Sequence, residues 1–171
     1  IAVAKQFVKL ESKQSEIFVK QALASIGQPH LIRIYQEIFR EYGLLSSQCL
    51  LSYSDFEKQQ SKNNIVNTIN VLVSNNYIPI INENDTVATD EIQFGDNDKL
   101  AALTATLLNV DLLLIATNTN GVYTKESIKN NAPETIHEVK NFEHLKNEVV
   151  NSKSSHGTGG MGSKIAPAEI S

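Results

Sequence analysis

A glycine-rich stretch near the end of the chain, Gly157-Thr158-Gly159-Gly160-Met161-Gly162-Ser163-Lys164, is the clearest ligand-binding signal in the sequence. Its four glycines within six residues allow backbone N–H groups to approach an anion closely. A helix expected to begin near Lys164 would direct its partially positive end to the same place, which favours phosphate as the ligand. The alternative interpretation is a flexible surface loop. A lysine at a helix N-terminus opposes the helix dipole by about 0.3–1 kcal/mol, so Lys164 suggests an anion nearby.

This stretch fits neither of two well-known phosphate-binding patterns. A P-loop requires adjacent glycine and lysine, and here Ser163 separates Gly162 from Lys164. A dinucleotide-binding fingerprint requires a strand directly before it, whereas residues 151–156 are polar.

A cluster of amide and acidic side chains follows the apolar run 77–81 and includes Asn82, Asn84 and Asp85. In an open α/β sheet, ligands bind just beyond the carboxyl ends of strands. These three side chains form a suitable donor and acceptor set for the ammonium and carboxylate groups of an amino acid. A simple turn would also account for them, because Asn and Asp side chains bond their own backbone.

Two further polar clusters have the same kind of position. Asp96, Asn97 and Asp98 precede an amphipathic segment, where they could cap a helix, each contributing about 0.5–1 kcal/mol, or take part in catalysis. A second cluster, which contains Thr117, Asn118, Gly121 and Tyr123, follows the apolar run 112–116.

Strands and helices alternate between these clusters. Apolar spacing predicts a helix over residues 15–42 with one buried face, interrupted by a kink or restart at Gly27-Gln28-Pro29 and ended by Gly43. Further helices are predicted around residues 65–73 and 100–108. A fully buried strand is expected at 48–52, a strand with a start or bulge at Pro79 over 77–81, and another strand at 112–116. This order predicts an α/β fold with a mostly parallel sheet covered on both faces.

Two segments have weaker patterns. Residues 86–94 could form an excursion or hairpin over the site, and residues 125–155 could form a nucleotide-side lid or a peripheral subregion.

Composition restricts the classes of protein. The chain has 171 residues, 41% of them hydrophobic, which suits one globular domain. A net charge of −4 without a basic stripe argues against nucleic acid as a partner. No apolar run approaches the roughly 20 residues of a membrane span, so we expect a cytoplasmic protein. Cys49 is expected to be a small buried hydrophobe. The histidines share no metal-ligand spacing, so no protein metal site is expected: His30, His137, His144 and His156.

The amino-acid sequence of these segments resembles that of a known family. The run IPIINENDTVATDEIQFGDNDKLAAL, the later GVYT and the distal GTGGMGSK are similar to the glutamate 5-kinase group of the amino-acid kinase family. The resemblance implies a three-layer α/β/α sandwich with a mostly parallel sheet, the carbamate kinase-like fold. It also implies that residues 1–171 form a single domain incomplete at both ends. A first strand with a phosphate-contacting lysine, and a glycine-serine loop, would precede Ile1.

The implied activity is ATP-dependent phosphorylation of the side-chain carboxylate of L-glutamate to glutamyl 5-phosphate, the first step of proline biosynthesis. ATP and Mg²⁺ would be the cofactors, no nucleic acid or membrane would be bound, and a homodimer or homotetramer is expected. The alternatives are another carboxylate kinase of the family, such as acetylglutamate kinase or aspartokinase, and a non-catalytic module that senses an amino acid or nucleotide.

The resemblance assigns roles to the clusters. Lys164 would stabilise the transferred group, Asp98 would orient two lysines, and Asp85 would hold glutamate. Asn97, Asn82 and Asn84 would also contact glutamate. The nucleotide contacts would be Thr117, Asn118, Tyr123, Thr158, Gly159, Gly160, Met161, Gly162, Ser163 and Lys164.

Some positions depart from the family pattern. Aspartate is usual where Asn118 and Asn120 stand, and Asp-Pro is usual where Glu126-Ser127 stands. These departures bear on nucleotide affinity and identity more than on the type of reaction.

Overall fold

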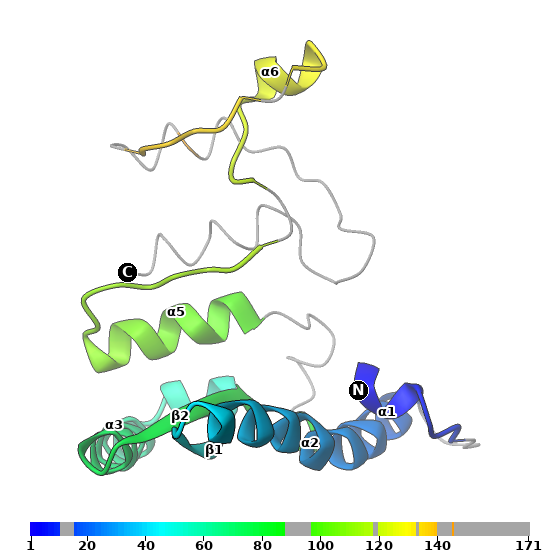
Figure 1. Ribbon diagram of the computed structural model, residues 1–171, viewed down its shortest axis with the longest axis vertical. Helices are drawn as coiled ribbons and strands as arrows, with labels where there is room; N and C mark the ends of the chain where they lie inside the picture. The colour runs from blue at the N-terminus through cyan, green and yellow to red at the C-terminus, as the bar shows by residue number, and fades with distance from the viewer. Residues whose placement is uncertain (11–15, 88–96, 118–119, 133, 140–144, 146–171) are drawn as a thin grey trace. The chain divides into compact units, whose positions relative to one another are not determined.

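The computed structural model of the protein describes residues 1–10, 16–87, 97–117, 120–132, 134–139 and 145. The chain divides into two compact units, Ile1–Gln93 and Phe94–Ser171, each with its own secondary structure (Figure 1). The single domain predicted from the sequence stays a prediction.

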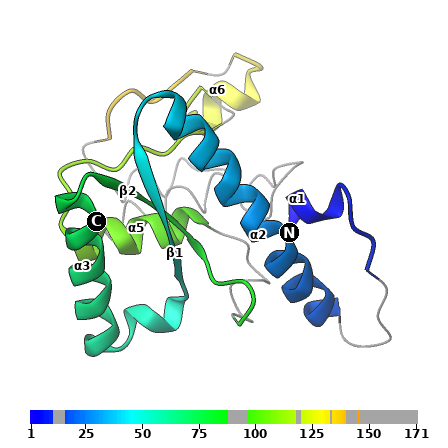
Figure 2. The ribbon, with the colours of Figure 1, turned by 60° about the horizontal axis from the view of Figure 1, so that its bottom comes forward.

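The first unit is built around two parallel strands. Its elements are α1 (Ala2–Lys5), α2 (Glu16–Glu41), β1 (Leu45–Leu51), the 3-10 helix η1 (Tyr53–Phe56), α3 (Gln59–Ser74) and β2 (Tyr77–Glu83). β1 and β2 pair in parallel from Leu45 opposite Tyr77 to Leu51 opposite Glu83. Figure 2 shows the two strands side by side, with α3 forming the crossover between them. The α/β fold with a parallel sheet predicted from the sequence is therefore confirmed.

Helix ends in this unit occur where a residue adopts a left-handed backbone. Gly43 has φ +68° directly after α2, and its N–H donates to Arg40 O at 3.0 Å. Asn76 has φ 61° after α3 and donates to Val73 O at 3.0 Å. Glycine and asparagine tolerate this conformation best, so the predicted stop at Gly43 is confirmed.

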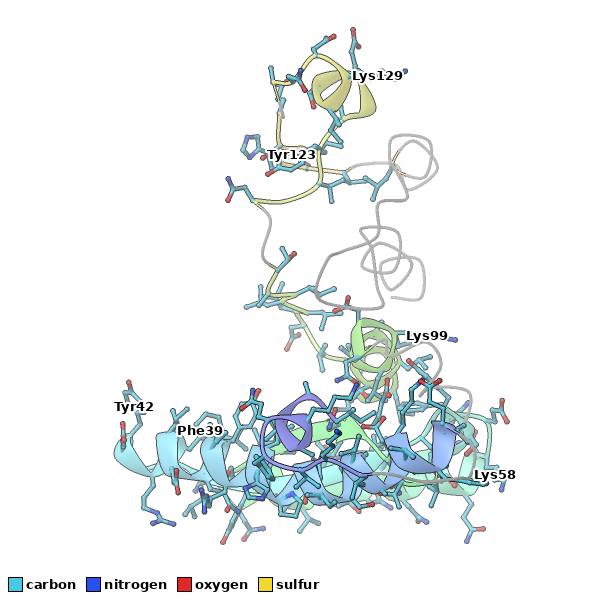
Figure 3. All side chains as sticks on the ribbon, turned by 90° about the vertical axis from the view of Figure 1, so that its right-hand side faces the viewer. Phe39, Tyr42, Lys58, Lys99, Tyr123 and Lys129 are labelled. Atoms are coloured by element: carbon cyan, nitrogen blue, oxygen red, sulfur yellow. The ribbon has the colours of Figure 1, made fainter. Side chains whose placement is uncertain are left out.

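Helix α2 continues through Pro29, so the predicted restart at Gly27-Gln28-Pro29 is wrong. Its buried residues are Leu23, Ala24 and Gly27, in the first half and the middle of the helix. The predicted buried face is wrong for the other half, where Ile34 and Ile38 are each 46% exposed. The reason is that the described residues of this unit cover the middle of α2 and leave its last turns open; Phe39 and Tyr42 lie at that end (Figure 3).

Both strands differ in detail from expectation. β1 is half-buried to exposed rather than fully buried. Among the described strands of this unit it pairs with β2 alone, so its other edge has no neighbouring strand. Cys49 in β1 is accordingly half-buried. Pro79 lies opposite Ser47 in an unbroken register, so the predicted start or bulge is wrong. The N–H of Asn84 donates to Leu51 O in β1, and successive N–H groups along a strand point in opposite directions. Pro79 lies an odd number of residues from Asn84, so its nitrogen faces away from β1. The missing N–H therefore removes no hydrogen bond between β1 and β2.

The second unit contains α5 (Asn97–Leu108) and the short helix α6 (Lys125–Lys129). The helix predicted over 100–108 is confirmed, with Leu100, Ala102, Thr104 and Ala105 buried. The predicted strand at 112–116 is wrong for the residues described: the segment has no strand assignment, and Leu114 is 82% exposed. The described residues of this unit place no strand beside it to accept its backbone hydrogen bonds.

Candidate functional site

A tight turn follows β2 and presents the first predicted cluster. The N–H of Asn84 donates to Leu51 O at 2.8 Å, which extends the parallel ladder one residue beyond the strand. The N–H of Val87 then donates to Asn84 O at 3.1 Å and closes a β-turn. We call residues 82–86 the 82–86 turn. Backbone bonds hold its Asn84 and Asp85 at the carboxyl end of β2, where α/β proteins bind ligands.

Helix α2 supports both ends of the 82–86 turn through side chains. Asn82 Nδ2 donates to Gln28 Oε1 at 3.0 Å, and the hydroxyls of Ser25 and Thr86 lie 2.9 Å apart. The hydroxyl of Ser25 also donates to Gln21 O at 3.1 Å, so Thr86 supplies the hydrogen between the two hydroxyls.

The 82–86 turn combines a buried carboxyl group with accessible polar groups. Glu83 is 6% exposed, whereas Asn82, Asn84 and Asp85 are half-buried and within reach of a ligand. The accessible carboxyl group of Asp85, beside two amides, favours a ligand that carries an ammonium group together with hydrogen-bonding groups. This chemistry matches an amino acid.

The polar residues beyond β1 have a structural explanation. One carboxylate oxygen of Asp55, Oδ2, accepts from the backbone N–H and the hydroxyl of Ser52, each at 2.8 Å. These bonds cap η1, so we assign Ser52 and Asp55 no part in ligand binding.

The second unit places Asn97 and Asp98 in the first turn of α5. Asn97 is exposed and Asp98 is half-buried. A first-turn acid stabilises a helix, so the structural role predicted for Asp98 is met. Its predicted catalytic role stays a prediction, as does the glutamate contact of Asn97.

The residues predicted to bind nucleotide are described in part. Thr117 is exposed at the end of the extended segment, and Gly121 has φ +136°. Tyr123 is half-buried, forms an antiparallel bridge with Thr135 and precedes α6 (Figure 3). Asn118, Thr158, Gly159, Gly160, Met161, Gly162, Ser163 and Lys164 lie outside the described residues.

Ser127, at a position expected to depart from the family pattern, takes part in capping α6. Thr124 caps α6 by accepting a hydrogen bond from Ser127 N at 3.2 Å, and Ser127 Oγ returns a bond to Thr124 O at 2.9 Å. Proline at position 127 could donate neither bond. Ser127 therefore fixes the start of this helix together with Thr124.

The structure brings Asn82, Asn84 and Asp85 together in the first unit. That residues of the second unit complete one site with them stays a prediction. The sequence did not indicate Ser25 and Gln28, because their partners are 61 and 54 residues away and neither residue belongs to a recognisable motif.

A pocket of about 470 Å³ lies in the second unit, beside the end of α5. None of the predicted site residues lines it, so we assign it no ligand; its lining is Ala105, Thr106, Asn109, Val110, Asp111, Leu112, Leu113 and Ile115.

Two searches of the described residues bear on partners. They contain no group of three or more His, Cys, Asp or Glu side chains that could hold a metal ion. In that same part of the chain, no helix combines the length and apolar character that crossing a membrane requires.

Comparison with known proteins gives a consistent result. The model of the amino acid kinase family matches residues 2–170. A glutamate 5-kinase of Alkaliphilus oremlandii is 41% identical over 160 residues, covering 93% of this chain and 61% of that protein. A glutamate 5-kinase of Vibrio campbellii is 39% identical over 171 residues, covering 99% of this chain and 45% of that protein.

A glutamate 5-kinase of Prochlorococcus marinus strain MIT 9301 is 37% identical over 168 residues, covering 96% of this chain and 47% of that protein. This chain thus spans about half the length of several curated relatives. The family model accounts for nearly every residue, and the parallel strands and the polar turn after β2 agree with the fold it implies. The chain belongs to the amino acid kinase family.

Proposed function

We propose that this chain is part of an enzyme that phosphorylates the side-chain carboxylate of L-glutamate with ATP and forms L-glutamyl 5-phosphate for proline biosynthesis. The observation that carries the proposal is the 82–86 turn, which presents Asn82, Asn84 and Asp85 at the carboxyl end of a parallel strand. The names of the relatives supply the specific substrate, because several glutamate 5-kinases align with more than nine-tenths of the chain.

In this proposal, the 82–86 turn recognises the amino-acid end of glutamate. Asp85 faces the ammonium group, and the amides of Asn82 and Asn84 donate to the α-carboxylate or accept from the ammonium group. Asn97 supplies a further contact from the first turn of α5. This arrangement leaves the side-chain carboxylate of glutamate to meet the nucleotide.

The reaction needs alignment and charge compensation more than acid–base chemistry. A glutamate side chain has an unperturbed pKa near 4.3, so the attacking carboxylate is already ionised at neutral pH. It attacks the terminal phosphorus of ATP, the bond from phosphorus to the bridging oxygen breaks, and ADP leaves. Both reactants are anionic, so the site must offset their repulsion with cations and N–H donors.

The glycine-rich stretch would supply those groups. Backbone N–H groups of residues 158–163 would hold the phosphates, and Lys164 would stabilise the charge on the transferred phosphoryl group. Asp98 would orient the lysines, while Thr117, Asn118 and Tyr123 would contact the base and ribose.

Mg²⁺ enters the proposal as the companion of ATP. The proposal places Mg²⁺ on the phosphates of ATP and names no protein ligand for it. Mg²⁺ in phosphotransferases commonly binds substrate phosphates and water with one or two carboxylates, and it neutralises phosphate charge.

The proposal is tested with the full-length protein, ATP, Mg²⁺ and one amino acid at a time. ADP release is coupled to NADH oxidation, and hydroxylamine traps the acyl phosphate as a hydroxamate. We expect turnover with L-glutamate. Turnover with N-acetylglutamate or aspartate instead would assign another carboxylate kinase, and ATP-independent amino-acid binding without turnover would indicate a sensing module.

A further inference from the structure

The 82–86 turn depends on a helix that lies far from it in the sequence. Gln28 and Ser25 are one helical turn apart on α2, and they reach the first and last residues of the 82–86 turn. Both contacts are between side chains, so the backbone bonds that define the strand and the β-turn would remain without them. Gln28 and Ser25 therefore do not determine the secondary structure, and their contacts act on the side chains of the 82–86 turn.

The contact with Gln28 fixes the orientation of an amide. Asn82 Nδ2 donates to Gln28 Oε1, so this nitrogen faces α2 and the carbonyl oxygen of the same amide is directed to its other side. A freely rotating amide would present either its donor or its acceptor to a ligand. The bond to Gln28 therefore fixes which edge of the Asn82 amide faces α2.

The position of Gln28 on α2 is itself well defined. Gly27 is buried against α1, where an added Cβ would lie 3.3 Å from Ala4 N and 3.4 Å from Ala4 Cβ. On its other side, Pro29 has a fixed φ. Gln28 is half-buried between these two residues, so its backbone has little freedom to follow a displaced 82–86 turn.

We propose that Gln28, assisted by Ser25, is a positioning residue for the amino-acid substrate: it orients the Asn82 amide and holds the 82–86 turn in its binding geometry. This inference rests on the proposed function, since it concerns the glutamate side of that site. It predicts that removing the hydrogen-bond acceptor of Gln28 raises KM for glutamate and leaves KM for ATP unchanged.

The first test replaces Gln28 with methionine in the full-length protein. Methionine has a similar length and helix propensity but lacks the strong acceptor. Loss of one neutral hydrogen bond should raise KM for glutamate about two- to ten-fold, with KM for ATP unchanged. The matched control is Gln36→Met, an exposed glutamine on the same helix, which should leave both KM values unchanged.

Two further variants separate positioning from stability. Gln28→Glu keeps an acceptor for Asn82 Nδ2, so its KM for glutamate should lie much closer to the wild-type value than the KM of Gln28→Met does. Ser25→Ala should raise KM for glutamate by a smaller factor, because the hydroxyls of Ser25 and Thr86 are exposed. If Gln28→Met does not fold, Gln28→Asn makes the same measurement, since it keeps the amide but is one methylene too short to reach Asn82.

A double-mutant cycle gives the decisive result. If Gln28 acts through Asn82, the Gln28→Met substitution should have no further effect on KM for glutamate once Asn82 is alanine. Equal effects of Gln28→Met in both backgrounds, or an unchanged KM in the wild-type background, would overturn the inference while leaving the proposed function intact. Absence of glutamate turnover in the unsubstituted protein would overturn the proposed function, and this inference with it.

Discussion

The Gly121→Ala substitution tests the backbone of the predicted nucleotide loop. Gly121 has φ +136°, a conformation that residues with a side chain rarely adopt, and forcing it costs about 1–3 kcal/mol. An added Cβ would also lie 2.7 Å from Thr135 Cγ2, so part of the loop must move. Overpacking of this kind typically costs about 1–3 kcal/mol. We expect the free energy of unfolding to fall by about 2–6 kcal/mol.

The measurement is urea denaturation of the full-length protein with two comparison variants. Gly43→Ala changes a glycine with φ +68° and no atom within 4 Å of the added Cβ, so it should lose only the backbone cost of about 1–2 kcal/mol. Thr135→Ser removes the methyl group that Cβ would strike. The Gly121→Ala/Thr135→Ser double variant should therefore recover about 1 kcal/mol relative to the sum of the single variants.

Two outcomes would refute this reasoning. If Gly121→Ala lowered the free energy of unfolding no more than Gly43→Ala does, then the close contact with Thr135 would contribute nothing to the loss of stability. If Thr135→Ser gave no recovery, the strain would lie in the backbone alone. The bridge between Tyr123 and Thr135 would then tolerate displacement.

Three further substitutions test the proposed site, and a labelling reaction tests the burial of Cys49. Lys164→Ala should lower kcat far more than it raises KM for glutamate, because its charge is needed most in the transition state; an unchanged kcat would contradict its role. Asp85→Asn should mainly raise KM for glutamate, whereas a rise in KM for ATP would mean that the pockets are exchanged. Asn118→Asp should lower KM for ATP a few-fold, since a charged acceptor binds ribose hydroxyls by about 1 kcal/mol more strongly, and an equal or higher KM would indicate another mode of nucleotide recognition. Burial raises the pKa of the Cys49 thiol, so at pH 8 less thiolate is present and iodoacetamide should label the native protein more slowly than the urea-unfolded one; equal rates would contradict this.

The local signals in the sequence predicted most elements of the first unit. Gly43 stopped α2 as expected because a left-handed backbone is a property of one residue and its neighbours. The strand after Asn76 and, in the second unit, helix α5 were predicted from apolar periodicity and turn residues. The polar cluster at Asn82, Asn84 and Asp85 was also visible, because it directly follows an apolar run.

Features that depend on tertiary context were not predictable in this way. Pro29 was expected to kink α2 or to make it restart, but α2 runs from Glu16 to Glu41 through this residue and buries Leu23, Ala24 and Gly27 just before it. Whether the missing N–H of Pro79 removes a bond between the strands depends on which edge of β2 pairs with β1. The contacts of Gln28 and Ser25 with the 82–86 turn depend on three-dimensional proximity alone.

The support of the 82–86 turn by α2 also has a consequence for folding. The two supporting bonds join residues 54 and 61 positions apart, and they enclose β1, α3 and β2. Bonds of such long range form slowly, because the intervening chain must be ordered before they offset the entropy lost. On the ribosome, α2 emerges long before Thr86. The proposed amino-acid site should thus form late in synthesis, after the strands have paired.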